Sequence, residues 1–330
     1  MPASETSLPP EHPPPSDIII SARGLTMRFG RETAIDSVSF DIPRGKIFGF
    51  IGPSGSGKTT TVRCLTGFYR PTAGEVRVLN CPPARFSPAL RQKIGYMPQQ
   101  FVLYPQLSVW ENLNFAASIY GLSFRRAKRL NQLLEFVELT DHKKKLARNL
   151  SGGMKRRLSL AATLVHNPEL LFLDEPTAGI DPVLRRRFWD HFRSLQNEGR
   201  TLFVTTQYVG EAAYCDYIGV MAGGRLLMVE TPDGLRRRAY GGELVDLQTV
   251  ERLTYPHLQQ LRQLPFVKDR VVRLDETNSV RMVVDDAGEA IPALMEWCRQ
   301  QNLTVETVEE HLPPFDDVFV EIVQHAAENR

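Results

Sequence analysis

A glycine-rich segment that ends in a lysine and a threonine is the part of this sequence best suited to chemistry. Its predicted ligand-binding residues are Gly52, Pro53, Ser54, Gly55, Ser56, Gly57, Lys58, Thr59 and Thr60. They fit the pattern GxxxxGK[ST], in which glycines let backbone N–H groups point at phosphate oxygens and the following helix adds its positive end. In such a loop Lys58 reaches the β- and γ-phosphates, and the Thr59 hydroxyl ligates Mg²⁺. The segment therefore predicts a nucleotide site.

An apolar run that ends in two carboxylates supports the same chemistry. Leu170–Leu173 is uniformly apolar, and Asp174 and Glu175 follow it directly. Open α/β folds bind ligands at the carboxyl ends of their strands. We therefore expect Asp174 to help hold Mg²⁺ and Glu175 to accept a hydrogen bond from an attacking water as general base. The alternative is that the pair lies on a solvated loop.

The segment 150–157, LSGGMKRR, resembles the LSGGQ signature of ATP-binding cassette (ABC) ATPases. Ser151 follows Lys58 by 93 residues and precedes Asp174 by 23, a layout usual in that family. Met154 stands where the family usually has glutamine. The resemblance covers residues 17–230 and implies that the chain binds ATP.

The signature residues also suit a phosphate for a local reason. Ser151 can cap the helix that follows, and Gly152 and Gly153 expose N–H groups at the positive end of that helix. In the resembling family this helix end binds the γ-phosphate of ATP held by a second subunit, so that two chains close around two nucleotides. Asp181, in the segment AGID, resembles the residue of that family that crosses the dimer interface.

Two further positions match the family's pattern. Phe29 lies 23 residues before Gly52 and resembles the aromatic residue that stacks on adenine; the alternative is a core strand residue. Gln99 lies six residues before Pro105 and resembles the glutamine that contacts Mg²⁺ and the attacking water while linking to the transport partner.

The chain departs from the family at one catalytic position. Where the family has a histidine that hydrogen-bonds the γ-phosphate, this chain has Gln207 after the segment VTT. A glutamine amide can donate that hydrogen bond but cannot titrate. Because Glu175 is retained, we expect ATP binding and dimer closure to survive and hydrolysis to be slowed. A heterodimer whose other subunit supplies a complete site is the alternative.

The elements that position these residues follow an α/β pattern. The runs Ile47–Ile51, Leu170–Leu173 and Leu202–Thr205 are apolar enough for strands covered on both faces, and helical segments separate them. Ala34–Ile42 alternates apolar and polar residues as a half-buried strand does. The resemblance implies a P-loop NTPase fold: a RecA-like parallel sheet, an antiparallel β-subdomain and an inserted helical subdomain at about residues 100–166.

Three segments are expected along the chain. Residues 1–16 hold six prolines and are interpreted as a disordered tail. Residues 17–230 form the ABC nucleotide-binding domain, and 231–330 alternate strand-like and helix-like runs as a small α+β accessory domain. The segment 314–319, PFDDVF, resembles the LEDVF-like ending of ATPases serving ABC-2 type, daunorubicin-resistance-like exporters, although a plain amphipathic helix explains it as well.

Composition excludes several other classes. The chain has 330 residues, 24% charged, and a net charge of +2, which gives no reason to expect disorder or nucleic acid. Its four cysteines lack CxxC spacing, against a disulfide framework or a zinc site. The longest charge-free stretch, Ile94–Trp110, is interrupted by prolines and glutamines, and the N-terminus lacks the apolar core of a signal peptide. We expect a soluble protein of a reducing compartment.

The function implied is the ATP-binding and ATP-hydrolysing subunit of an ABC-2 type exporter, with ATP and Mg²⁺ as cofactors. Its expected partners are a transmembrane permease and a second ATPase subunit, identical or not, at the cytoplasmic face of the cell membrane. The alternative is a soluble ABC-type ATPase acting on ribosomes or DNA. Such proteins usually carry two cassettes or a long coiled coil, whereas Gln99 and Leu150 are 51 residues apart here. A P-loop kinase or GTPase gives no reason for the signature.

Overall fold

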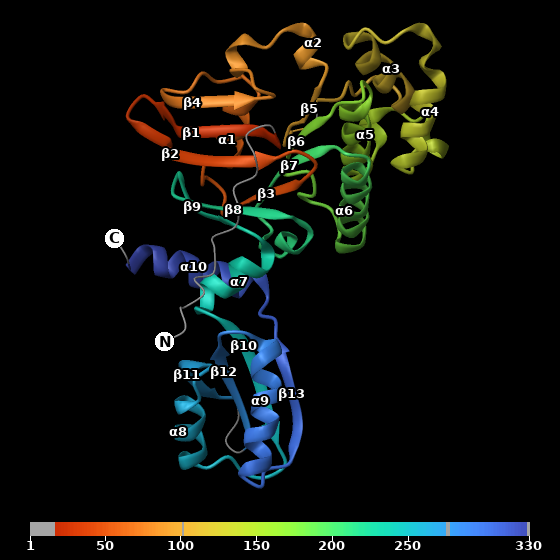
Figure 1. Cartoon of the computed structure of the whole chain (residues 1–330). Coiled ribbons are helices and arrows are strands. Elements are labelled where there is room, and N and C mark those ends of the chain that lie inside the picture. The colour runs from red at the N-terminus through yellow and green to blue at the C-terminus, as the bar shows by residue number, and fades with distance from the viewer. Residues whose placement is uncertain (1–16, 101, 275–277, 329–330) are drawn as a thin grey trace. The chain divides into compact units, whose positions relative to one another are not determined.

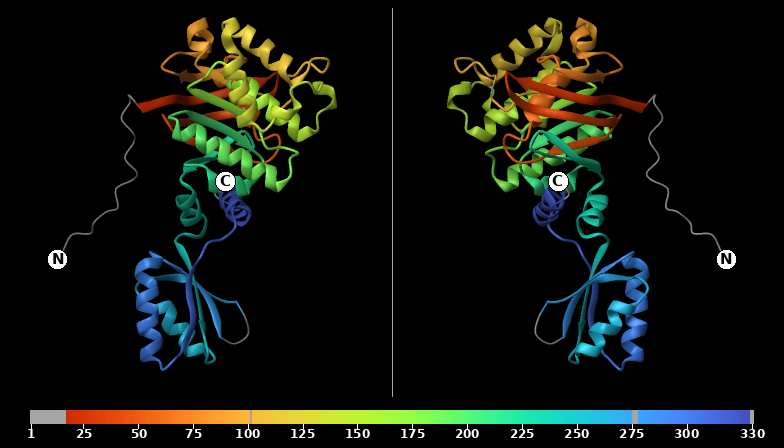
Figure 2. Two further views of the ribbon diagram at one scale, coloured as in Figure 1. Left: turned by 90° about the vertical axis from the view of Figure 1, so that its right-hand side faces the viewer. Right: turned by 90° about the vertical axis from the view of Figure 1, so that its left-hand side faces the viewer.

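The computed structural model describes residues 17–100, 102–274 and 278–328. The predicted tail, residues 1–16, lies outside them. The chain forms two compact units, Met1–Val229 and Glu230–Arg330, each described by itself below (Figures 1 and 2). Among the described residues, no helix combines the length and the apolar character that crossing a bilayer requires.

A six-stranded sheet forms the centre of the first unit. Its strand order is β5-β6-β7-β3-β8-β9, and every pairing from β5 to β8 is parallel. The strands are β3 (Ile47–Ile51), β5 (Ile94–Met97), β6 (Leu170–Asp174), β7 (Thr201–Thr206), β8 (Tyr217–Ala222) and β9 (Arg225–Glu230). All residues of β3, β6 and β7 are buried, which confirms the three predicted double-covered strands. Sequence analysis missed β5, β8 and β9.

A second, antiparallel sheet has the order β2-β1-β4. It comprises β1 (Ile18–Phe29), β2 (Glu32–Pro43) and β4 (Ala73–Val78). Aromatic rings join it to the parallel sheet: the ring centroid of Phe40 lies 5.8 Å from that of Phe48 and 6.2 Å from that of Phe203. Burying such rings stabilises a core strongly. The two sheets therefore share one hydrophobic core, as expected for the β-subdomain.

Helices flank the parallel sheet and form the inserted subdomain (Figure 1). They are α1 (Lys58–Leu65), α2 (Pro88–Arg91), α3 (Val109–Ile119), α4 (Ala127–Phe136), α5 (Gly152–Leu164) and α6 (Pro182–Asn197). At the start of α3, Ser108 accepts a hydrogen bond from the Glu111 N–H while the Glu111 carboxylate accepts one from the Ser108 N–H. This capping box fixes the beginning of the helical subdomain.

The second unit is an α+β domain built on a four-stranded antiparallel sheet of order β11-β12-β10-β13. Two helices, α8 and α9, lie on one face of that sheet (Figure 1). Its elements are α7 (Pro232–Tyr240), β10 (Glu243–Thr249), α8 (Tyr255–Gln263), β11 (Val267–Arg273), β12 (Ser279–Val284), α9 (Ala287–Gln300), β13 (Val305–His311) and α10 (Phe315–Glu328). In the PFDDVF segment, Phe315 and Val318 are buried and Asp316 and Asp317 are exposed, the pattern of an amphipathic helix.

Candidate functional site

The glycine-rich loop connects β3 to α1, as its motif requires. Gly57, just before α1, has φ +102°, a backbone conformation that favours glycine. Lys58 is only 4% exposed, and its Nζ donates to the carbonyl oxygens of Gly52 (2.7 Å) and Pro53 (2.9 Å). Burial lowers the pKa of Lys58, and the negative charges of Glu175 and Asp174 oppose that shift. The ammonium group is thus held inside the curl of the loop.

Gly52 is required by close packing at the end of β3. A Cβ at this position would lie 2.2 Å from the backbone oxygen of Met221 and 2.8 Å from Ser56 Oγ. We expect Gly52→Ala to lower the free energy of unfolding by about 2–3 kcal/mol, because the backbone of β8 cannot yield cheaply. Chemical denaturation measures this loss. The control is Gly152→Ala, where a Cβ meets nothing within 4 Å; an equal loss there would contradict the packing argument.

Asp174 lies at the end of β6, beside the start of α1. Its Oδ1 accepts hydrogen bonds from the hydroxyls of Thr59 (3.1 Å) and Thr205 (2.5 Å). Asp174 is fully buried, yet its Oδ2 has no hydrogen-bond partner within the described part of the chain. A buried carboxylate oxygen left unpaired is costly. This orphaned oxygen, next to the Thr59 hydroxyl, fits a Mg²⁺ site, because hard cations prefer oxygen ligands.

Glu175 follows with an unusual backbone, at φ +48°. Its N–H donates to the Thr205 backbone oxygen and Oγ1, both at 3.0 Å. Its side chain, 7% exposed, accepts a hydrogen bond at Oε2 from Gln99 Nε2 (2.9 Å). The carboxylate and the predicted glutamine are therefore adjacent, although they lie 76 residues apart. A carboxylate so fixed at a strand end can serve as a general base once water is bound beside it.

Arg156 of α5 helps to hold Gln99, the hydrogen-bond partner of Glu175, in place. Its Nη1 donates to the backbone oxygen of Gln99 (2.8 Å), and the side chain is nearly buried. Burial lowers the pKa of Arg156, opposed by the charges of Glu175 and Asp174. Sequence analysis missed both Arg156 and Thr205. No local pattern marks either residue, because their positions follow from tertiary structure: Arg156 lies on the buried face of α5, and Thr205 of β7 pairs in register with Asp174 of β6.

Gln207 lies just past β7, across from the glycine-rich loop. Its Oε1 accepts a hydrogen bond from Ser54 Oγ (3.0 Å). Because the carbonyl end of the amide faces the serine, the NH₂ end is the group left to donate to a ligand. The Gly52 N–H also approaches the Thr206 backbone oxygen, at 3.4 Å, so this segment and the loop lie side by side.

A second group of predicted residues surrounds the start of α5. Ser151 caps α5 by accepting from the Met154 N–H (3.3 Å), and Asp181 caps α6 by accepting from the Leu184 N–H (2.9 Å). The two helix ends are adjacent, since a Cβ on Gly153 would lie 2.6 Å from Leu184 Cδ2. Ser151 and Gly152 are exposed. This group presents two helix N-termini to solvent, which suits an anion from another molecule.

Phe29 ends β1 and is 43% exposed, so it is not a core residue. Its ring meets that of Tyr69 edge to face, with centroids 5.3 Å apart.

The rest of the predicted set belongs to the glycine-rich loop and the start of α1: Gly55 at φ +79°, Ser56 nearly buried and Thr60 half-buried. The structure thus brings together one group of predicted side chains, namely Ser54, Lys58, Thr59, Gln99, Asp174, Glu175 and Gln207.

Comparison with known proteins agrees with this arrangement. The family described as ABC transporter matches residues 35–178. The chain is 36% identical to the daunorubicin resistance ATP-binding protein DrrA3 of Streptomyces coeruleorubidus, over 93% of this chain and 96% of that protein. It is 41% identical to the probable multidrug ABC transporter ATP-binding protein YbhF of Escherichia coli, over 70% of this chain but only 40% of YbhF.

The fold has close counterparts among solved structures. A dimeric structure of MJ0796, a bacterial ABC transporter cassette, matches with a TM-score of 0.60 and 28% identity. The match covers 64% of this chain and 98% of that one. The site geometry, the family match and the full-length similarity to DrrA3 lead to one conclusion. The chain belongs to the ABC transporter family.

Proposed function

We propose that the chain powers an ABC-2 type exporter from the cytoplasmic face of the cell membrane, as one half of a dimer that closes around MgATP. The observation that carries this proposal is the similarity to DrrA3, which spans both units and nearly the whole of each chain. DrrA3 is named for daunorubicin resistance. Homologues named for Nod factor export, such as that of Ralstonia nicotianae at 37% identity over 76% of its length, support export as the direction.

In the proposed cycle the loop residues bind the triphosphate and position it for attack. Lys58 neutralises part of the charge of the β- and γ-phosphates. Thr59, Asp174 and Gln99 would hold Mg²⁺, which would neutralise more of that charge. Glu175 takes the proton of the attacking water, and Gln207 donates to the γ-phosphate through its NH₂ group. Phe29, which is exposed at the end of β1, stacks on adenine.

The second group completes the site of the other subunit. Ser151, Gly152 and Gly153 would bind the γ-phosphate of ATP on the partner, and Asp181 would lie at the interface. ATP binding therefore favours the closed dimer, and hydrolysis removes the group that holds the two faces together. ATP would be bound between the two faces in the same way whether or not the second subunit is identical.

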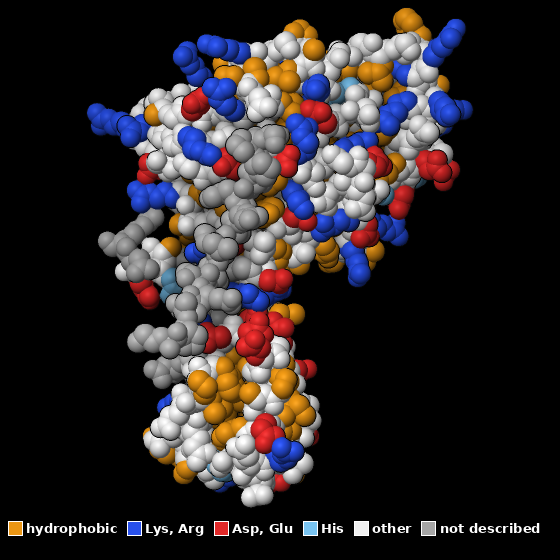
Figure 3. Space-filling model, viewed as in Figure 1, with side chains coloured by type: hydrophobic (Ala, Val, Ile, Leu, Met, Phe, Trp, Pro, Cys, Tyr) orange, Lys and Arg blue, Asp and Glu red, His pale blue; other side chains and the backbone are white. Residues whose placement is uncertain are grey.

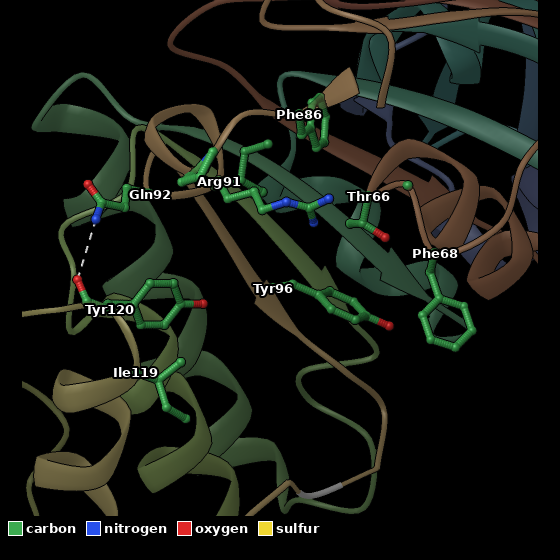
Figure 4. A pocket seen from close by; sticks show the side chains of 11 residues that line it. Thr66, Phe68, Phe86, Arg91, Gln92, Tyr96, Ile119 and Tyr120 are labelled. Atoms are coloured by element: carbon green, nitrogen blue, oxygen red, sulfur yellow. Dashed lines mark hydrogen bonds between the residues drawn. The ribbon is translucent and has the colours of Figure 1, made fainter. Parts of the chain in front are cut away.

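A cleft beside the site is suited to a permease segment. The cavity, of about 560 Å³, lies between the ends of α1 and α3, the segment around α2, and β5, and its side chains are shown in Figure 4. Phe68, Phe86, Tyr96, Ile119 and Tyr120 make it mainly apolar and aromatic. Hydrophobic and basic side chains also appear along the end of this unit that carries α2, α3 and α4 (Figure 3). Such a surface suits an apolar helix held at a membrane.

The position of this cleft would connect a docked helix to the chemistry. Tyr96 belongs to β5 and lines the cleft, and Gln99 follows three residues later. Any shift of β5 therefore moves the amide that contacts Glu175. Purification of the tagged chain from detergent-solubilised membranes tests the proposal: a multispanning permease in stoichiometric amount supports it, whereas ribosomal proteins or DNA as the main partners overturn it.

We expect Gln207→His to raise kcat for ATP hydrolysis by about tenfold. A histidine can carry a positive charge, and a hydrogen bond from a charged donor is worth about 1.5 kcal/mol more than one from a neutral amide. Steady-state turnover of the purified chain measures the effect, with Gln207→Ala as the variant that removes the donor. A histidine variant no faster than the wild type would discard the idea that glutamine slows this site.

A further inference from the structure

The segment after Gln207 is held by the first turn of α6. Tyr208 follows Gln207 directly, and a short 3-10 helix, η6 (Val209–Tyr214), comes next. The guanidinium carbon of Arg185 lies 4.0 Å from the centroid of the Tyr208 ring, an arrangement in which the cation is attracted to the ring face. Arg185 therefore restrains the residue next to the predicted γ-phosphate donor.

The same arginine faces a buried carboxylate. Glu211 of η6 is only 2% exposed, and its Oε1 lies 3.5 Å from Arg185 Nε. Neither oxygen of Glu211 accepts a hydrogen bond among the described residues. A buried charge without a counter-charge is strongly unfavourable. Glu211 therefore keeps the guanidinium of Arg185 in place over Tyr208 by charge attraction and not by a fitted hydrogen bond.

Arg185 is also linked through its backbone to the surface that we propose contacts the dimer partner. The Arg185 N–H donates to the Asp181 backbone oxygen (2.9 Å), so Arg185 belongs to the turn that Asp181 caps. The preceding residue, Leu184, is the one that approaches Gly153. Farther along, Trp189 of α6 stacks on Tyr214 of η6, with centroids 5.2 Å apart. α6 thus contacts η6 at two places, through Arg185 and Glu211 and through Trp189 and Tyr214.

We propose that Arg185 is a positioning residue that couples the partner-facing ends of α5 and α6 to Gln207 of the same chain. This inference rests on the proposed function. When the nucleotide of a second subunit binds to Ser151 to Gly153 and contacts the Asp181 cap, the first turn of α6 becomes fixed in position. Arg185 then fixes Tyr208, and with it the Gln207 amide against Ser54. When the partner-facing group binds the second subunit's nucleotide, the nucleotide site at the glycine-rich loop of the same chain is thereby positioned for hydrolysis.

The central test is the double variant Arg185→Met/Glu211→Gln. Arg185→Met alone leaves the buried carboxylate without its cation and endangers folding, whereas the double variant removes both charges at nearly constant size. We expect its thermal midpoint and its affinity for MgATP to stay close to the wild type. Its kcat should fall by about 10- to 100-fold, because the donor to the γ-phosphate is no longer fixed. The Hill coefficient for ATP should fall toward one.

A second measurement does not depend on turnover. In a Glu175→Gln background, MgATP should increase the protection of residues 207–214 from hydrogen exchange, together with that of the glycine-rich loop. Adding Arg185→Met/Glu211→Gln should abolish the increase at 207–214 and leave that at the loop. The matched control is Arg187→Met/Glu138→Gln, which removes an exposed ion pair (2.8 Å) between Arg187 of the same helix and Glu138, which lies outside that helix, and should change neither readout.

The outcomes distinguish a failure of the role given to Arg185 from a failure of the proposed function. Wild-type kcat and an unchanged exchange pattern in the double variant overturn the role of Arg185 while leaving the ATPase assignment intact. A wild-type chain that neither binds nor hydrolyses MgATP overturns the proposed function, and the inference with it. A lowered thermal midpoint with normal kcat per folded molecule shows a purely structural pair and likewise overturns the coupling.

Discussion

Replacing Glu175 with glutamine is expected to lower kcat for ATP hydrolysis by about 10²- to 10⁴-fold, the range that a general base contributes. The amide has nearly the same shape and can still contact Gln99, but it cannot take a proton from water. Glu175 is 7% exposed and is fixed on both its backbone and its side chain. ATP affinity should therefore change little, because the groups that hold the phosphates are untouched.

The same variant should accumulate as an ATP-bound dimer. If hydrolysis reopens the dimer, then blocking hydrolysis leaves the closed state populated, and light scattering with MgATP should show twice the mass of the nucleotide-free chain. Glu169→Gln, at the opposite end of β6, is the control and should behave as the wild type. A Glu175→Gln chain that stays monomeric and free of nucleotide would contradict both the catalytic and the dimer assignments.

Replacing Lys58 with alanine is expected to weaken MgATP binding by at least about 100-fold, since a hydrogen bond to a charged group contributes about 1.5–3 kcal/mol and two phosphates lose theirs. The buried ammonium already lies at the centre of the loop, held by two backbone oxygens. It needs only to exchange those partners for phosphate oxygens. Fluorescent-nucleotide titration measures the affinity.

The fold of the Lys58→Ala chain must be checked separately. The two carbonyl oxygens that Lys58 satisfies would be left to water, so a modest loss of stability is expected along with the loss of affinity. Lys46→Ala, which removes a cation near the start of β3 instead, should keep the wild-type affinity. Equal weakening by both variants would show that overall charge, and not the loop geometry, governs binding.

The strands that sequence analysis found and missed differ for a physical reason. β3, β6 and β7 are buried on both faces, so they appear as apolar runs. β5 is only four residues long and β9 is only partly buried, so neither appears as a long apolar run. β8 contains an interior glycine, which usually weakens a strand assignment, but β3 contains Gly49 and was still found, so β8 could have been found too. Large side chains crowd Gly95 and Gly219: a Cβ would lie 2.8 Å from Leu171 Cδ2 in one case and 2.8 Å from Phe50 Cδ2 in the other.

The sequence predicts those parts of the candidate site that form local motifs with a characteristic spacing. The loop, the carboxylate pair and the signature each have a recognisable local pattern. The hydrogen bond between Gln99 and Glu175 depends on how two strand ends meet in space, and the positive φ of Glu175 has no sign in its residue type. The roles of Thr205 and Arg156 likewise come from tertiary contacts, which one sequence does not encode locally.

The stack of Trp189 on Tyr214 gives this chain an optical reporter of its own. The chain has three tryptophans, and Trp189, only 2% exposed, is the one that bridges α6 and η6. With the other two, Trp110 and Trp297, changed to phenylalanine, the emission of the remaining indole would report the movement of α6 against η6. Stopped-flow mixing with nucleotide could then time that step without attaching a dye.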